Sequence, residues 1–305
     1  MAKTNTAASR PENEKLSERT HQRVFIVDDE LAILDVLSRG LENAGFKATT
    51  FSVGREFERA EVVDAIRNGQ IVARYQPIVD LPNHQVVAAE ALARWQHPTE
   101  GLLPPSSFLA KLDHDGLNEL THCMLRNVFQ NKTLWAREGI AIDLSVNVPT
   151  SVIVDPQFTA EIVKLMERHQ TTLQGIVLEI TESDDMPDVH QLAGTLSALC
   201  LKGARVAVDD FGTGFSSLSR LQCLPIDEVK IDKSFIRHCV THHDDRKIVE
   251  AVIALAHALD MRVVAEGVET EATALLLSEL GCDCAQGYLF GRPVSAGELG
   301  GLVPR

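Results

Sequence analysis

The sequence predicts an α/β fold, a modified TIM (β/α)8 barrel with one antiparallel strand, preceded by a short N-terminal β-α-β fragment. Eight apolar, strand-like runs follow residue 58, and segments with helical periodicity separate them after the second run. Eight strands with crossover helices favour a barrel. The first two runs are joined only by the turn "LPNH" at 81–84, which allows a hairpin and is too short for a parallel crossover.

The amino-terminal part of the chain is expected to form a tail and then a small β-α-β unit. Residues 1–22 are polar throughout, which predicts a flexible tail. The unit is assigned to 23–57. Its strand, amphipathic helix and second strand are predicted at 23–27, 31–45 and 47–52.

The barrel is assigned to residues 58–300, and a chain of 305 residues with 45% hydrophobic content can bury such a core. Its eight strands are predicted at 72–80, 85–95, 140–148, 175–182, 204–212, 227–232, 261–268 and 284–290. Helical periodicity is clearest at 106–139 and 244–260. Residues 301–305 are expected to be the remnant of a cleavable tag.

Charge and hydropathy exclude several classes of partner. The formal net charge of -14 argues against binding to DNA, RNA or an anionic membrane. We find no apolar run long enough for a membrane span and no signal peptide at the polar start, so we expect a cytoplasmic protein. The six cysteines lack zinc-like spacing and are expected to be reduced structural thiols.

Polar side chains fall at or near the carboxyl-terminal ends of the predicted strands. They are Gln76, Glu90, Asn147, Glu179, Asp209, Asp210, Lys230, Glu266 and Gln286. Taken singly, each acid is explained as a solvated loop residue or a cap. In a barrel, however, these strand ends converge on one mouth, where clustered carboxylates would raise each other's pKa values unless cations neutralise them. Oxygen ligands without His or Cys favour Mg²⁺ or Mn²⁺, and adjacent aspartates can serve two ions.

Sequence motifs in this order carry a family resemblance. They are "EALAR" at 90–94, "SVNV", "LEITE", "VDDFGTGFSSLSRL", "VKIDKSFI", "AEGVET" and "CAQGYLFGRP". From Val62 to Val294 the chain resembles the EAL-domain phosphodiesterases. The resemblance implies a modified TIM barrel with one antiparallel strand. It also implies an enzyme that hydrolyses cyclic di-GMP to linear pGpG with Mg²⁺ or Mn²⁺.

The resemblance further implies roles for individual residues. Two ions would be bound by Glu90, Asn147, Glu179 and Asp209 on one side and by Asp209, Asp210 and Glu266 on the other. Lys230 would orient or help deprotonate the attacking water, and it forms the catalytic set with Glu90, Asp209, Asp210 and Glu266. Gln76 and Arg94 would hold the substrate phosphate, and Gln286 would line the site.

Two acids and one loop complete what the resemblance implies. Glu182 and Glu269 would hold the loop that follows Asp210. That loop, Phe211–Leu218, is apolar and would reach a dimer interface, so we expect a homodimer.

A second pair of acids, Asp28 and Asp29, follows the first strand of the N-terminal unit. Residues 24–51 resemble the opening of a response-regulator receiver domain, in which such acids help to bind Mg²⁺. The third strand with its phosphate-accepting aspartate has no counterpart, so we interpret the unit as a truncated receiver that takes no phosphate.

Two functions of different class are consistent with the sequence. The first is the metal-dependent phosphodiesterase. The alternative is a catalytically silent EAL-type receptor that binds cyclic di-GMP and signals through a partner. Silent members are expected to lack a ligand acid or the lysine, and this chain has all of them, which favours the enzyme. A third, weaker hypothesis is a regulatory protein whose N-terminal unit docks elsewhere.

Overall fold

The computed structural model describes residues 23–27, 31–44, 46–51, 54–181, 189–212 and 218–303. The chain divides into two compact units, Met1–Asp64 and Ala65–Arg305.

The N-terminal unit has the predicted β-α-β order. It contains β1 (Arg23–Val27), α2 (Leu31–Asn43) and β2 (Lys47–Phe51). The two strands pair in parallel along their whole length, as a crossover through a helix requires. Asp28 and Asp29 lie outside the described residues, so the receiver-like interpretation stays a prediction. Helix α3 (Gly54–Arg67) follows and leads into the second unit.

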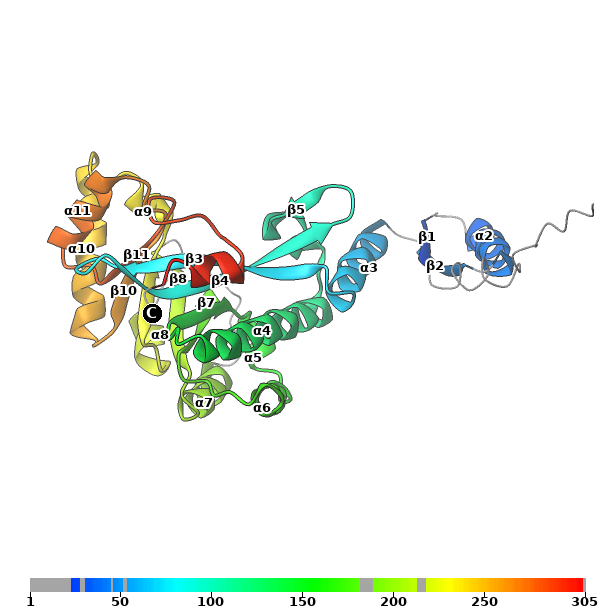
Figure 1. Ribbon diagram of the computed structural model, residues 1–305, viewed down its shortest axis with the longest axis horizontal. Coiled ribbons are helices and arrows are strands. Elements are labelled where there is room, and N and C mark those ends of the chain that lie inside the picture. The colour runs from blue at the N-terminus through cyan, green and yellow to red at the C-terminus, as the bar shows by residue number, and fades with distance from the viewer. Residues whose placement is uncertain are drawn as a thin grey trace, which may run out of the picture. The chain divides into compact units, whose positions relative to one another are not determined.

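The second unit is the predicted eight-stranded barrel (Figure 1). Its strands are β3 (Ile71–Asp80), β4 (Gln85–His97), β6 (Asp143–Asn147), β7 (Ile176–Thr181), β8 (Arg205–Phe211), β9 (Glu228–Ile231), β10 (Arg262–Ala265) and β11 (Cys284–Gln286). Neighbouring strands pair from β4 through β11, and β3 closes the ring by pairing with both β11 and β4.

The antiparallel strand is β3, which confirms the interpretation of the short turn. It runs antiparallel to β4 and to β11, whereas the other barrel pairs from β4 to β11 are parallel. In the turn, the Asp80 carboxylate accepts from the Asn83 backbone amide at 2.9 Å. His84 takes a φ of 54°, and its amide donates to the Asp80 carbonyl at 2.8 Å. The tight hairpin is therefore held by its own backbone and by one aspartate.

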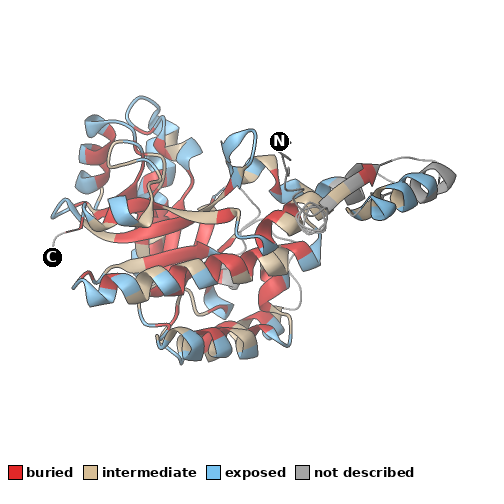
Figure 2. Cartoon of the chain, turned by 45° about the vertical axis from the view of Figure 1, so that its right-hand side comes forward, coloured by how far each residue is buried: buried red, intermediate tan, exposed pale blue. Residues whose placement is uncertain are grey.

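Helices surround the strands and turn their apolar faces inward, so that the buried residues gather on the barrel and the exposed ones on its outside (Figure 2). They are α4 (His114–Arg137), α5 (Thr150–Ile153), α6 (Phe158–His169), α7 (Val189–Cys200), α8 (Leu218–Cys223), α9 (Lys233–Ile236), α10 (His243–Ala258), α11 (Glu271–Glu279) and α12 (Ala296–Gly300). Two 3-10 turns, η1 (Pro105–Ser107) and η2 (Leu109–Lys111), precede α4. Within the described part of the chain, no helix has the length and apolar character needed to cross a membrane.

Several element bounds differ from the sequence prediction: the helical stretch 106–139 is an α-helix only at His114–Arg137, and the strand predicted at 261–268 is Arg262–Ala265. A further strand, β5 (Gly101–Leu103), pairs antiparallel with the end of β4. The eighth predicted strand, 284–290, ends already at Gln286, because the amides of Phe290 and Gly291 both donate to the Gly287 carbonyl at 3.1 Å and close a turn. The apolar residues after Gln286 therefore lie in a turn and not in the strand.

Candidate active site

The structure brings the predicted polar residues together at one mouth of the barrel. Parallel register places Asn147 beside Glu179, at the carboxyl-terminal ends of β6 and β7. Gln76 and Glu90 differ from the prediction, since both lie in the middle of their strands and face each other across the β3–β4 pair. Past the mouth, the two strands continue as an antiparallel pair as far as Ile71 and Trp95, which is why the site is not at their ends; the hairpin turn at 81–84 lies at the opposite end.

Lys230 is the centre of the cluster. Its Nζ lies 2.7 Å from Glu266 Oε1, 3.0 Å from Glu179 Oε2, 3.3 Å from Asp209 Oδ1 and 3.4 Å from Glu90 Oε2. The lysine is completely buried, with 0% of its side chain exposed. One positive charge therefore faces four carboxylates that come from four different strands or strand ends.

Glu90 is held by amide groups as well as by the lysine. Asn147 Nδ2 donates to Glu90 Oε1 at 2.8 Å, and Gln286 Nε2 donates to Glu90 Oε2 at 2.6 Å. Gln286 Nε2 is also 3.1 Å from Gln76 Oε1, and Gln76 Nε2 donates to the Gly291 carbonyl at 3.1 Å. This chain of amides fixes the orientation of Glu90 and joins β3, β4, β6 and β11 at the site.

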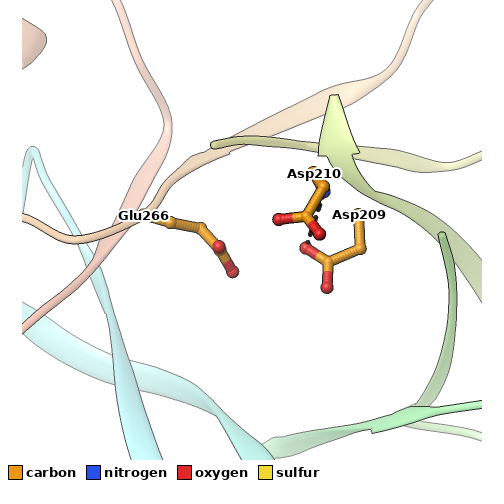
Figure 3. A group of neighbouring side chains, drawn as sticks. All are labelled: Asp209, Asp210 and Glu266. Carbon is orange, nitrogen blue, oxygen red and sulfur yellow. Dashed lines mark hydrogen bonds between the residues drawn. The ribbon is translucent and has the colours of Figure 1, made fainter. Parts of the chain in front are cut away.

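Asp209, Asp210 and Glu266, which Figure 3 shows, are less deeply buried than Glu90 and Glu179. One oxygen atom from each of the three carboxylates lies within 4.8 Å of the others, a spacing that one metal ion could occupy. Figure 3 shows Glu266 reaching from the end of β10 toward the two aspartates at the end of β8. Asp210 has a φ of 54°, which is unusual for a residue other than glycine, and its amide donates to Asp209 Oδ1 at 3.0 Å.

Burial and charge shift the pKa values of the inner residues in different directions. Burial and the charges of Glu90 and Asp209 raise the pKa of Glu179 well above its usual range. Burial alone would raise the pKa of Glu90 too, but Lys230, Gln286 and Asn147 lower it on balance. Burial would lower the pKa of Lys230, but the surrounding acids outweigh that effect and raise it well above its usual value. The lysine is therefore held as a cation.

Two acids of the cluster, Asp210 and Glu266, have pKa values near neutrality. Burial, the charges of Asp209 and Asp232 and a hydrogen bond with Asp232 raise the pKa of Asp210 to about 6. Burial, with the charges of Asp209 and Glu90, raises that of Glu266 to about 7 despite the opposing effect of Lys230. Asp232 was not among the predicted site residues. The sequence could have indicated Asp232 as a site residue, because it stands two residues after Lys230 in "VKID".

The residues fit hard divalent cations. The buried carboxylate of Glu179 shares its cation, Lys230 at 3.0 Å from Oε2, with three other acids, and incomplete compensation of a buried charge is costly. The single lysine leaves an excess of negative charge among the acids that surround it. The donors are carboxylate and amide oxygens, the ligands that Mg²⁺ and Mn²⁺ prefer.

Three predicted residues lie outside this contact network or outside the described chain. Arg94 is half-buried on β4 and donates to the neighbouring Ala93 carbonyl at 2.7 Å. Glu269 is exposed, and its Oε1 lies 3.9 Å from Arg237 Nη2. Glu182 falls outside the described residues, so its expected support of the loop after Asp210 stays a prediction.

A lysine-centred group of buried carboxylates at the mouth of a (β/α) barrel defines a barrel protein with a site suited to divalent cations. The particular family follows from comparison with known proteins. The model of the EAL domain family matches residues 59–293, and the chain belongs to that family.

Known relatives share most of this chain. An uncharacterised protein of Mycobacterium tuberculosis is 42% identical over 223 residues, which cover 72% of this chain and 36% of that protein. The bifunctional diguanylate cyclase/cyclic di-GMP phosphodiesterase MucR of Pseudomonas aeruginosa is 38% identical over 237 residues. These residues cover 77% of this chain and 35% of MucR. The solved structure of the MucR phosphodiesterase in complex with cyclic di-GMP has a TM-score of 0.75 and 36% identity, and covers 80% of this chain and 99% of that one. The chain thus spans about a third of the length of these curated relatives.

Proposed function

We propose that this protein is a metal-dependent phosphodiesterase that hydrolyses cyclic di-GMP to linear pGpG and so lowers the level of this second messenger. The observation that carries the proposal is the complete cluster of four carboxylates around the buried Lys230. The names of two relatives support the substrate, because MucR and NbdA of Pseudomonas aeruginosa are both described as cyclic di-GMP phosphodiesterases.

The proposed metal ligands are the acids around Lys230 and their neighbours Asn147 and Asp210. Two ions, Mg²⁺ or Mn²⁺, would be held by Glu90, Asn147, Glu179, Asp209, Asp210 and Glu266, with Asp209 shared. Such ions supply positive charge for the phosphate oxygens and make a bound water more acidic. The amide contacts from Asn147 and Gln286 keep Glu90 oriented for this task.

Lys230 has the catalytic role in the proposal. Because Lys230 is held as a cation, it can orient the attacking water and help its deprotonation through its positive charge, while a carboxylate of the set accepts the proton. The water oxygen forms a bond to phosphorus, one ester bond to a ribose oxygen breaks, and that oxygen takes up a proton. Glu90, Asp209, Asp210 and Glu266 complete the catalytic set.

Substrate binding falls to groups at the rim of the cluster. Gln76 and Arg94 would hold the phosphate, and Gln286 would line the pocket. Glu182 and Glu269 would support the loop after Asp210.

The proposal includes a homodimer through that loop, which lies largely outside the described residues, and a cytoplasmic location. A monomer in light scattering at micromolar concentrations would contradict the dimer.

The test is direct. The purified protein is incubated with cyclic di-GMP and Mn²⁺, and the products are separated by chromatography. A linear pGpG product supports the enzyme, provided that the Glu90→Ala variant forms none. Tight binding of cyclic di-GMP without any product would instead support the silent receptor.

A further inference from the structure

Three polar side chains at the start of α10 take no part in the reaction proposed above. His238 and His242 lie in the turn that joins α9 to α10, and His242 directly precedes α10. Asp245 lies in the first turn of that helix. The turn follows β9, the strand that carries Lys230.

The backbone places the two histidines on the same side of one helical turn. The His242 amide donates to the His238 carbonyl at 2.8 Å, and the Arg246 amide donates to the His242 carbonyl at 3.1 Å. Both are hydrogen bonds between residues four apart, as in an α-helix. Side chains at this spacing are neighbours on the helix surface. Two histidines four apart on one helical face can hold a transition-metal ion such as Zn²⁺.

The imidazole rings of His238 and His242 lie side by side. Their centroids are 5.2 Å apart, and the ring planes are inclined by 28°. Both residues are exposed, so either ring can rotate about its side-chain bonds without disturbing the core. Such a rotation would turn one nitrogen atom of each ring toward a shared ion.

Asp245 determines which nitrogen of His242 is available to an ion. Asp245 Oδ2 lies 3.3 Å from His242 Nδ1. An ionised carboxylate only accepts hydrogen bonds, so the neutral imidazole carries its proton on Nδ1 and keeps a lone pair on Nε2. Histidines that ligate a metal usually donate their other nitrogen to a carboxylate or carbonyl in this way, which fixes the ring and makes the ligand more basic. The His242 side chain is 65% exposed and that of Asp245 is 25% exposed, so the ring stays open to an ion from solvent.

The chemistry of the donors selects the class of ion. Imidazole nitrogen suits Zn²⁺, Ni²⁺ and Cu²⁺, whereas Mg²⁺ prefers oxygen ligands. Cys239 stands between the two histidines in the sequence, but it is buried and its thiol donates to the Ile236 carbonyl at 3.1 Å. Burial also raises the pKa of this thiol, which keeps it protonated and unsuited to a metal. The site therefore offers two nitrogen ligands, and water would complete the coordination.

We propose that His238 and His242 form a surface site for one transition-metal ion of the Zn²⁺, Ni²⁺ and Cu²⁺ class, with Asp245 as a positioning residue that orients His242. An ion bound there would link the two ends of the turn between α9 and α10. The inference does not depend on the proposed hydrolysis of cyclic di-GMP. The alternative is that the three side chains only form a solvated entry to α10.

The experiment uses the full chain and two probe ions. Ni²⁺ is titrated by calorimetry in excess Mg²⁺, which competes for oxygen ligands but poorly for imidazole. Cu²⁺ is then bound, and its electron paramagnetic resonance spectrum is searched for coupling to imidazole nitrogen. The described side chains that contact Lys230 are carboxylates, so this coupling would distinguish the new site from the acid cluster.

The variants remove one group at a time. They are His238→Ala, His242→Ala, Asp245→Ala and Asp245→Asn, and His243→Ala at the neighbouring exposed histidine is the matched control. We expect the wild type to bind one Ni²⁺ ion per chain at this site and to show two coupled nitrogens with Cu²⁺. Asp245→Ala should weaken Ni²⁺ binding by about 10-fold, the lower end of what loss of an outer hydrogen-bond partner costs.

Loss of either histidine should weaken Ni²⁺ binding more than Asp245→Ala does and should leave one coupled nitrogen in the Cu²⁺ spectrum. Asp245→Asn keeps an oxygen that accepts from Nδ1, so it should bind Ni²⁺ more tightly than Asp245→Ala. The control His243→Ala should bind Ni²⁺ like the wild type.

Several results would overturn the inference. A wild type that binds no Ni²⁺ in excess Mg²⁺ would do so, as would unchanged binding by both His238→Ala and His242→Ala. A Cu²⁺ spectrum without two imidazole nitrogens would favour the solvated helix entry. An equal loss of binding in His243→Ala would contradict the choice of ligands, and wild-type binding by Asp245→Ala would remove the positioning role.

Discussion

Lys230 Nζ lies 2.7 Å from Glu266 Oε1, and this contact joins the carboxyl-terminal ends of two neighbouring barrel strands inside the acid cluster. The lysine has no access to solvent, and it also contacts Glu179 at 3.0 Å. A single cation thus holds together acids that would otherwise repel one another. Its removal should affect both stability and turnover.

We predict that Lys230→Met lowers the free energy of unfolding of the metal-free protein at pH 8 by about 3 to 5 kcal/mol, because it leaves buried carboxylates without their cation. Turnover of cyclic di-GMP should fall by about 10²- to 10⁴-fold, the usual contribution of a positioned proton-transfer group. Urea denaturation and steady-state rates measure the two effects. Lys247→Met, at an exposed lysine of α10, is the control. Normal turnover in Lys230→Met would end the catalytic role.

The Glu90→Ala variant should lose metal affinity and turnover together. Glu90 contacts Lys230, Asn147 and Gln286, so its removal disconnects the lysine from the amides. We expect Mn²⁺ to bind more than about 100-fold more weakly, since loss of an outer hydrogen-bond partner alone costs about 10- to 100-fold. Calorimetric titration with Mn²⁺ measures this. Glu250→Ala, at an exposed acid of α10, should bind Mn²⁺ like the wild type.

Metal removal should abolish hydrolysis. We expect no turnover in excess EDTA and recovery with Mg²⁺ or Mn²⁺. Ca²⁺ should inhibit, because it is larger and accepts a less strict geometry than the two smaller ions. Chromatography of the products with each ion gives the answer. Full activity in excess EDTA would rule out the metal-dependent reaction.

The stability of the metal-free protein should rise as the pH falls from 8 to 6. The folded protein raises the pKa of Glu266 to about 7 and that of Asp210 to about 6, so ionisation of both is less favourable in the folded than in the unfolded state. At pH 8 this destabilisation is fully present, and it is relieved as protons bind through these two pKa values. Urea denaturation in EDTA at several pH values tests this.

The Glu266→Gln variant tests how much of this pH dependence of stability comes from Glu266. Glu266→Gln cannot ionise and should show a flatter change in stability between pH 8 and 6. Protons compete with metal ions for the same oxygens, so the affinity of the wild type for Mn²⁺ should fall over this range. Equal slopes for the wild type and Glu266→Gln would show that Glu266 does not titrate there.

The N-terminal unit should not respond to small phosphodonors. A receiver switch needs an aspartate acceptor on a third strand, and the described β1-α2-β2 unit contains two strands, β1 and β2. We expect acetyl phosphate to leave the intact mass and the rate of hydrolysis unchanged. A phosphoryl-sized gain in mass that disappears in an Asp28→Asn or Asp29→Asn variant, with a changed rate, would show a working switch.

Much of the architecture could be predicted from the sequence because the barrel strands are short apolar runs with polar ends. The turn at 81–84 was enough to identify an antiparallel strand, since four residues cannot carry a parallel crossover. The short strand β5 could not be predicted, because three residues have no periodicity and pair only where β4 extends past the barrel.

By itself the sequence determined which residue types stand at the strand ends, and therefore that carboxylates, an asparagine and a lysine share one mouth. Only the tertiary structure decided how they meet. Lys230 is surrounded by Glu90, Glu179, Asp209 and Glu266 because strands that are distant along the chain are neighbours in the closed ring. Such distances depend on register and closure, which arise from packing of the whole barrel and not from any local pattern.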